Sequence, residues 1–397
     1  MADHLTRASS LLKRVPLVDG HNDLAWALRE RFGSDPESAP LSEAVPGLQT
    51  DLPRLRRGRV GAQFWSVYVP GTLAGDGAVT ATLEQIDLVR QLIHRYGDDL
   101  ELALTADDVE RIFASGKIAS LLGAEGGHSI ASSLSVLRAF HALGVRYLTL
   151  THNHNVPWAD AATDVPACGG LTPFGAEVVR EMQRLGMLVD LSHVSADTAR
   201  ATLRIAEAPV MFSHSSAREL CDHPRNVPDD VLAELAGNDG ICMVTFVPEF
   251  ISPASRAWDL DLAAEMERQG IDYKDLSARV RVREELTARR RPPVATLAQV
   301  ADHIEHIRAV AGIERVGIGG DYDGTEQPEG LQDVSCYPAL IAELMDRGWT
   351  EYECALLAGG NLLRVLREAE SAARKLSSLR GPSTARIEEL DRGVTAT

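Results

Sequence analysis

The regular alternation of short apolar runs with segments of helical period most constrains the fold of this chain. The runs lie at residues 15–20, 60–69, 117–124, 145–151, 186–192, 208–213, 241–246 and 315–320. Most of them are apolar on both faces, as parallel strands are when helices cover the sheet on each side. We therefore expect an α/β fold in which eight strands close a distorted (β/α)8 TIM barrel.

An open, doubly wound sheet is the alternative architecture. It would normally carry a glycine-rich phosphate loop after the first strand, and DGHNDLAW follows the first apolar run instead. The helices are expected at residues 80–96, 132–143, 173–185, 195–206, 228–236 and 296–311. Two stretches fall outside the repeat: a charge-dense helical insertion after the seventh strand at 252–293, and a C-terminal tail at 370–397. We expect residues 1–397 to form one domain.

Composition narrows the class of protein. The 397 residues are 45% hydrophobic and 24% charged, which favours a globular chain over a disordered or fibrous one. The 40 Lys and Arg against 57 Asp and Glu give a net charge of −17, which argues against a nucleic-acid partner. No signal-peptide core or membrane-spanning run is apparent. The cysteines are odd in number and contain no CxxC, which predicts reduced thiols: Cys168, Cys221, Cys242, Cys336 and Cys354. These features lead us to expect a soluble, cytoplasmic protein with no membrane partner.

Histidines and carboxylates gather at the ends of the expected strands. The histidines are His21, His152, His193 and His214, and the carboxylates are Asp23, Glu125 and Asp321. In a parallel barrel the carboxyl ends of all strands share one rim, so these residues should converge there. We expect the active site on this rim.

Imidazole and carboxylate without cysteine are the ligands of a catalytic divalent ion. His21 and Asp23 are two positions apart, so both side chains lie on one side of an extended backbone and can hold one ion. His193 and His214 end adjacent strands and could hold a second, with Glu125 as the bridge. Two ions about 3.5 to 4 Å apart would lower the pKa of a shared water towards about 7.

Each of these residues also has a local explanation. Glu125 beside two glycines could stabilise a helix start, and Asp321 in GGDYDG could be part of a turn, with Asp323 a competitor for its role. The coincidence of so many strand ends favours the metal site. We expect His128 and His154 to be loop or orienting residues.

The sequence resembles the membrane (renal) dipeptidase family of zinc peptidases. The matching motifs are VDGHNDLAW, GAQFWSVYVP, LLGAEGGHSI, YLTLTHNHNVPWAD, LVDLSHVS, FSHSSAREL, RNVPDDVL and VGIGGDYDG. The resemblance implies two zinc ions per subunit, with His21 and Asp23 on the first ion, Glu125 as the bridge, and His193 and His214 on the second.

The resemblance also implies the remaining roles. His152 would reach the substrate carbonyl or tetrahedral intermediate, Arg225 would bind the terminal carboxylate, and Asp321 would handle the proton. The substrate would be a dipeptide, with a D-residue tolerated at its C-terminal position, and the enzyme could be a homodimer. Two alternatives stay open: a metal hydrolase acting on a lactone, cyclic amide or phosphoester, and a non-catalytic binding protein.

Overall fold

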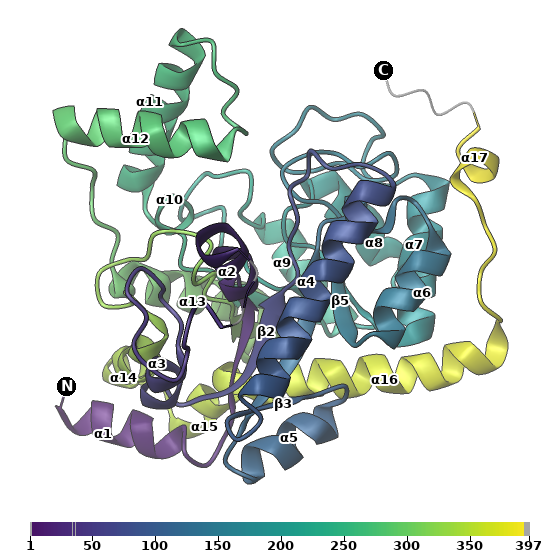
Figure 1. Ribbon diagram of the computed structural model, residues 1–397. Helices are drawn as coiled ribbons and strands as arrows, with labels where there is room; N and C mark the ends of the chain where they lie inside the picture. Colours follow the sequence, from purple (N-terminus) through teal and green to yellow (C-terminus); the bar gives the residue numbers. More distant parts are fainter. Residues whose placement is uncertain (1, 34, 36, 393–397) are drawn as a thin grey trace.

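The centre of the protein is a closed parallel barrel of eight strands, surrounded by helices in a single α/β domain (Figure 1). The computed structural model describes residues 2–33, 35 and 37–392. The ring strands are β1 (Leu17–Asn22), β2 (Val60–Ser66), β4 (Ile118–Glu125), β5 (Val145–Thr149), β6 (Leu188–Asp190), β7 (Met211–Phe212), β8 (Ile241–Val244) and β9 (Val316–Ile318). Pairings of β2 with β4 and of β1 with β9 close the ring, which confirms the expected barrel.

A short additional strand, β3 (Leu100–Leu102), lies beside the ring and was not expected from the sequence. It pairs with the first residues of β4, while β5 takes the later part of that same edge, from Leu122 to Glu125. The opposite edge of β4 is occupied by β2. This strand carries the charged Glu101 and only Leu100 in it is buried, so it lacks the apolar run on both faces by which the ring strands were predicted.

The barrel interior is packed with side chains. Every residue of β2 and of β4 is buried, as the two-sided apolar pattern predicted. Phe64, Leu121, Tyr147 and Met243 belong to the cluster that fills the interior. A larger cluster joins the strands to the surrounding helices, so both faces of the sheet contribute to the hydrophobic core.

Six of the helices around the barrel follow the expected segments closely, while those at Ala106–Ala114 and Tyr337–Asp346 were not expected from the sequence. They include α4 (Asp76–Arg95), α5 (Ala106–Ala114), α6 (Leu134–Ala142), α7 (Pro173–Leu185), α8 (Ala196–Ile205), α9 (Asp229–Asn238), α13 (Leu297–Ala311) and α14 (Tyr337–Asp346). The sequence sets the ends of α7: the Thr172 hydroxyl accepts from the Gly175 N–H at 3.1 Å, and Gly186 stops the helix at φ 78°.

The smaller helices lie near the two ends of the chain and in the loops. They are α1 (Ala2–Leu11), α2 (Leu24–Phe32), α3 (Leu52–Arg57), α10 (Pro248–Ile251) and α15 (Glu351–Ala355).

The expected insertion is a helical hairpin that stands apart from the barrel at the upper left of Figure 1. It consists of α11 (Pro253–Arg268) and α12 (Leu276–Arg289), and it packs around its own small core of Trp258, Leu262, Met266 and Val282. Lys274 Nζ lies 2.8 Å from Asp164 Oδ1 in the segment after β5. The hairpin therefore sits on the rim where the strands end.

The C-terminal region consists of a long helix and a segment that packs against the start of α7. Residues 370–379 belong to α16 (Asn361–Leu379), which runs along the bottom of the barrel in Figure 1. After α17 (Ile387–Leu390), Asp391 accepts hydrogen bonds from the Thr172 hydroxyl at 2.7 Å and from the Phe174 N–H at 3.0 Å. The segment is thus fastened to the start of α7. Residues 393–397 of the expected tail lie outside the described part of the chain.

Candidate active site

The structure places seven of the expected site residues at the carboxyl end of a strand or shortly after it. They are His21 in β1, Asp23 directly after β1, Glu125 at the end of β4, His152 after β5, His193 after β6, His214 after β7 and Asp321 after β9. Arg225 lies in the segment between β7 and α9. The barrel thus brings together residues that are up to three hundred positions apart in the sequence.

Glu125 stands between two groups of potential ligand atoms. Its Oε2 lies 3.4 Å from His21 Nε2, which in turn lies 3.4 Å from Asp23 Oδ2. Its Oε1 lies 3.0 Å from His193 Nε2 and 3.5 Å from His214 Nε2. The Nε2 atoms of His193 and His214 are 3.0 Å apart. Glu125 therefore faces His21 with one carboxylate oxygen, and His193 and His214 with the other.

These separations suit bound metal ions. Ligand atoms about 2.0 to 2.1 Å from a tetrahedral ion lie about 3.3 Å from one another. Buried polar atoms normally have partners, yet His21 Nε2 and Asp23 Oδ1 have no hydrogen-bond partner among the described residues. The donor set and its unpaired atoms both fit a divalent cation.

Burial and neighbouring charges shift the ionisation of the cluster. Burial opposes ionisation of Glu125, but His21 and His193 outweigh it and hold the pKa of the carboxyl well below its usual value. Burial lowers the pKa of His193 and of His214 well below the usual range. Neutral imidazoles beside an ionised carboxylate are the forms that bind a metal ion.

The pKa of His21 shifts in the opposite direction. Burial lowers it, but Tyr147, Glu125 and Asp23 together raise it well above its usual value. The Tyr147 hydroxyl lies 2.8 Å from His21 Nδ1, so the Nε2 atom of His21 is the one that faces the carboxylates.

His152 borders the cluster on the side of β5. Its Nε2 lies 3.9 Å from Glu125 Oε1, and its ring centroid lies 4.3 Å from that of His193 and 4.8 Å from that of Tyr68. Burial lowers the pKa of His152 to about 4. This imidazole is therefore neutral near pH 7, so one of its nitrogens donates a hydrogen bond and the other accepts one.

Arg225 is a buried cation with neutral partners. Its guanidinium donates to the His214 carbonyl oxygen at 3.2 Å and to the Ser215 hydroxyl at 3.4 Å, and it lies 5.3 Å from the centre of the Phe250 ring. Its Nε has no hydrogen-bond partner among the described residues. Burial lowers the pKa of Arg225 to about 10, which still leaves it charged at neutral pH.

The two aspartates of GGDYDG have different surroundings. Asp321 offers a ligand atom within 4.8 Å of those of His21 and Asp23. Burial, followed by the negative charge of Asp23, raises the pKa of Asp321 well above its usual value. Asp323 instead accepts from the Gln49 N–H at 2.7 Å. Asp321 is thus the aspartate that belongs to the cluster.

Two further histidines lie near the rim. His128 Nε2 is 3.1 Å from the Val69 carbonyl oxygen, and burial lowers the pKa of its ring. Burial and then the nearby Lys274 lower the pKa of His154.

Sequence reasoning missed two side chains that support the histidines. Tyr147 reaches His21 from β5, and Ser213 Oγ lies 2.8 Å from His214 Nδ1. Tyr147 alternates with Arg146 and Leu148 along its strand, a pattern that indicates which face it occupies but not which partner it meets.

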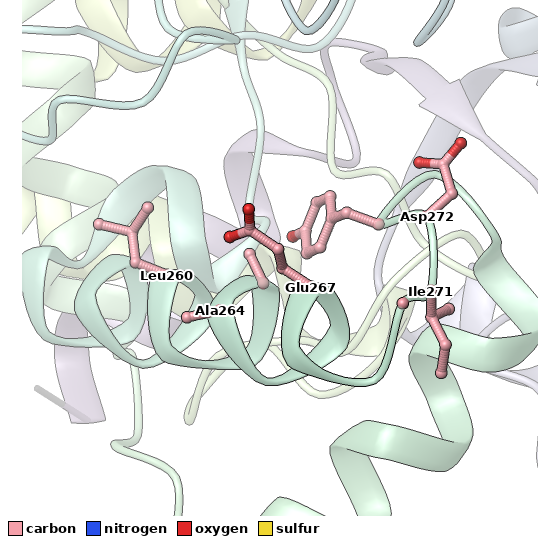
Figure 2. A pocket seen from close by; sticks show the side chains of 8 residues that line it. Leu260, Ala264, Glu267, Ile271 and Asp272 are labelled. Carbon is pink, nitrogen blue, oxygen red and sulfur yellow. The ribbon is translucent and has the colours of Figure 1, made fainter.

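A hollow of about 620 Å³ lies on the insertion, away from these residues (Figure 2). It is lined by α11 and the turn after it, including Leu260, Glu267 and Asp272. None of the site residues expected from the sequence lines it.

A closed barrel with imidazoles and carboxylates at its strand ends defines a metal-dependent hydrolase. The chain belongs to the membrane dipeptidase family (peptidase family M19), which matches residues 5–380, and it is accordingly a metal-dependent peptide hydrolase. It is 44% identical to Dipeptidase 3 of Mus musculus over 93% of this chain and 67% of that protein. It is also 44% identical to Dipeptidase 3 of Macaca fascicularis over 96% of this chain and 71% of that protein.

Solved structures share the fold. The probable dipeptidase PvdM from Pseudomonas aeruginosa superposes with a TM-score of 0.81 at 24% identity, covering 94% of this chain and all of that one. A metallo peptidase from Rhodobacter sphaeroides, liganded with a phosphinate mimic of the dipeptide L-Ala-D-Ala, gives 0.74 at 22% identity, covering 89% and 99%.

The family corrects the expected location. A cytoplasmic protein was expected, and this is wrong for a member of the membrane dipeptidases whose relatives are Dipeptidase 3 proteins. The expected absence of a membrane partner also loses its support. Net charge and unpaired cysteines are properties of the folded barrel and do not indicate the compartment in which the protein is located. The five cysteines are unpaired in the structure, as expected. Among the described residues, no helix is long and apolar enough to cross a membrane.

Proposed function

We propose that this chain is a binuclear zinc dipeptidase that cleaves dipeptides carrying a free terminal carboxylate. The observation that carries this proposal is the position of Glu125, whose Oε2 lies 3.4 Å from His21 and whose Oε1 lies 3.0 Å from His193 and 3.5 Å from His214. A bridging carboxylate is the arrangement expected of a two-metal hydrolase. The barrel and its 252–293 insertion would act as one catalytic domain.

His21 and Asp23 would hold one zinc ion, His193 and His214 the other, and Glu125 both. Zinc suits this set of nitrogen and oxygen ligands, because it binds both imidazole and carboxylate. When bound, the ions would supply Lewis acidity and a water of lowered pKa.

Arg225 would bind the terminal carboxylate of the substrate. Among the described residues the hydrogen-bond partners of this buried guanidinium are neutral, so it can still pair with an anion, and its planar fork can bind both carboxylate oxygens. Its contact with the His214 carbonyl oxygen at 3.2 Å keeps this charge next to the proposed ligands. A carboxylate bound by Arg225 would thus lie close to the proposed metal ligands, which would favour a substrate as short as a dipeptide.

His152 and Asp321 would supply the hydrogen bond and the proton transfer that cleavage of the peptide bond requires. His152 Nε2 lies 3.9 Å from Glu125 Oε1 and would donate a hydrogen bond to the carbonyl oxygen as negative charge develops on it. Asp321, beside His21 and Asp23, would take a proton from the attacking water and pass it to the leaving amine.

We further propose that a D-residue is tolerated at the C-terminal position of the substrate. The support comes from the Rhodobacter sphaeroides structure, whose ligand mimics L-Ala-D-Ala. Because Arg225 would hold the carboxylate, the side chain on the neighbouring carbon could point either way.

A substrate panel tests the proposal. Purified protein is assayed against L,L and L,D dipeptides, N-acyl amino acids, lactones and phosphate esters, each with and without a chelator. We expect chelator-sensitive cleavage of both dipeptide sets and little turnover of the others. Rapid turnover of a lactone or phosphate ester with no dipeptide cleavage would refute the proposal.

A further inference from the structure

A chain of hydrogen bonds runs from His214 into the barrel wall. Ser213 Oγ lies 2.8 Å from His214 Nδ1, on the side of the ring opposite the Nε2 that faces Glu125. The same Ser213 Oγ lies 2.6 Å from Asp190 Oδ2. Asp190 and Ser213 are fully buried and His214 is 1% exposed, so water does not compete for these contacts.

The direction of each proton in this chain follows from Asp190. An ionised carboxylate can only accept hydrogen bonds. Its Oδ1 accepts from the backbone N–H groups of Ser192 at 3.1 Å and Ser213 at 2.8 Å. Its Oδ2 accepts from the hydroxyls of Thr149 at 2.5 Å and Ser213.

Ser213 has a single hydroxyl proton, and the short contact with Asp190 takes it. The other neighbouring hydroxyl, that of Ser192, is 3.4 Å away and already accepts from the His214 N–H at 3.0 Å. The Ser213 oxygen must therefore accept a hydrogen bond from His214 Nδ1–H. A neutral imidazole carries one proton, so this leaves the lone pair on Nε2.

We propose that Asp190 and Ser213 are positioning residues that fix His214 as the Nδ1–H tautomer and thereby set its affinity for a divalent metal ion. The inference rests on the proposed function only in taking His214 as a metal ligand. A ring held in the binding tautomer and orientation loses no free energy in reaching it, which is how outer hydrogen bonds raise metal affinity.

The other two histidines lack such an anchor. The Tyr147 hydroxyl that contacts His21 Nδ1 can donate or accept, so it does not set the direction of the proton. His193 Nδ1 has no hydrogen-bond partner among the described residues. The second proposed metal position therefore depends on His214 for its fixed geometry.

The backbone of Ser213 is also held in place. A β-carbon at Gly20 or at Gly319 would collide with the Ser213 carbonyl oxygen, so both glycines pack directly against it. This packing therefore holds in place the backbone that carries the Ser213 hydroxyl.

Asp190→Asn tests the direction of the protons with almost no change in shape. The two backbone N–H groups at Oδ1 still need an acceptor, so the new amide nitrogen takes the place of Oδ2. It would donate to Ser213 Oγ, and Ser213 would then donate to His214 Nδ1. The proton of His214 would move to Nε2, the atom that should bind the metal.

Histidine nitrogen NMR on the metal-free, full-length protein reads the tautomer, with His214 assigned by the signals lost in His214→Gln. We expect Nδ1–H in the wild type and Nε2–H in Asp190→Asn. Zinc competition against a chelator should show the weaker zinc bound about 10- to 100-fold less tightly in Asp190→Asn and in Ser213→Ala. Ser216→Ala is the matched control, because its buried hydroxyl contacts the Thr245 carbonyl oxygen at 3.3 Å, and its affinity should equal that of the wild type.

An Nε2–H tautomer in the wild type would overturn the inference, as would unchanged zinc affinity in Ser213→Ala. If Asp190→Asn fails to fold, the wild-type tautomer and Ser213→Ala still decide the question. Neither measurement uses a substrate, so a failure to cleave dipeptides would count against the proposed function and leave this result intact.

Discussion

The guanidinium of Arg225 donates to the carbonyl oxygen of His214 at 3.2 Å, so this buried charge lies against the backbone of a proposed metal ligand. Arg225→Ala removes the charge and leaves the ligand side chain in place. We expect KM for dipeptides to rise about 10- to 100-fold, the loss expected for a buried charged hydrogen bond of about 1.5 to 3 kcal/mol, with a smaller change in kcat. Steady-state kinetics check this.

Dipeptide amides provide the control for Arg225, because they lack the terminal carboxylate. They should be poor substrates of the wild type, and Arg225→Ala should affect them little. An equal loss on amides and acids would mean that Arg225 does not bind the carboxylate.

Asp321→Asn should mainly lower kcat. The amide keeps the shape of the side chain but cannot take a proton, so we expect kcat to fall roughly 100- to 10,000-fold with KM nearly unchanged. Asp323→Asn is the matched control, since its carboxylate accepts from the Gln49 N–H and an amide oxygen can do the same. A larger loss of kcat in Asp323→Asn than in Asp321→Asn would contradict this prediction and would assign the proton transfer to Asp323.

The contact between Gly319 and Ser213 predicts a stability effect. An added β-carbon at Gly319 would overlap the Ser213 carbonyl oxygen, so Gly319→Ala should lower the free energy of unfolding by about 3 kcal/mol. Gly237→Ala, near the end of α9, meets nothing within 4 Å and should change stability by less than about 1 kcal/mol, in the stabilising direction. Urea denaturation of both variants measures these free energies. Equal stability of the two variants would contradict the prediction and would mean that the strand ends can move apart to make room for the added β-carbon.

His303 predicts a loss of stability in acid. Its Nδ1 accepts from the Ala217 N–H at 3.0 Å, and burial lowers its pKa to about 4. Below the unfolded pKa of about 6.5 the unfolded chain binds a proton that the folded chain does not, so stability falls as the pH drops towards 4. Between pH 7.5 and 5.5 this group should cost about 1 kcal/mol.

The variant His303→Gln isolates that contribution. Its free energy of unfolding should fall by about 1 kcal/mol less than that of the wild type over the same pH interval. His94→Gln, the same substitution on an exposed face of α4, should keep the wild-type slope. If the free energy of unfolding changed equally with pH in all three proteins, His303 would not be the group that titrates.

The sequence predicted the ring strands because a strand buried on both faces leaves an apolar run, and β2 and β4 are buried throughout. It also predicted the convergence of His21, Glu125 and His214, since parallel strands end on one rim. It could not predict the partners behind the histidines. Ser213 and Tyr147 have residue types that occur in any buried strand, and only the packed barrel shows which imidazole each one meets.

The cellular location of the protein could not be predicted from its composition. A negative charge and unpaired cysteines suit barrels in many compartments, so the cytoplasmic expectation had no physical basis in the folded domain.

Counting the bound zinc tests the central claim most directly. Protein loaded with zinc and freed of excess metal is analysed by elemental mass spectrometry, alongside Glu125→Ala and the exposed control Glu110→Ala. We predict two zinc ions per chain in the wild type and in Glu110→Ala, and fewer than two in Glu125→Ala, because Glu125 would ligate both ions. Two ions retained in Glu125→Ala, or at most one in the wild type, would contradict the account.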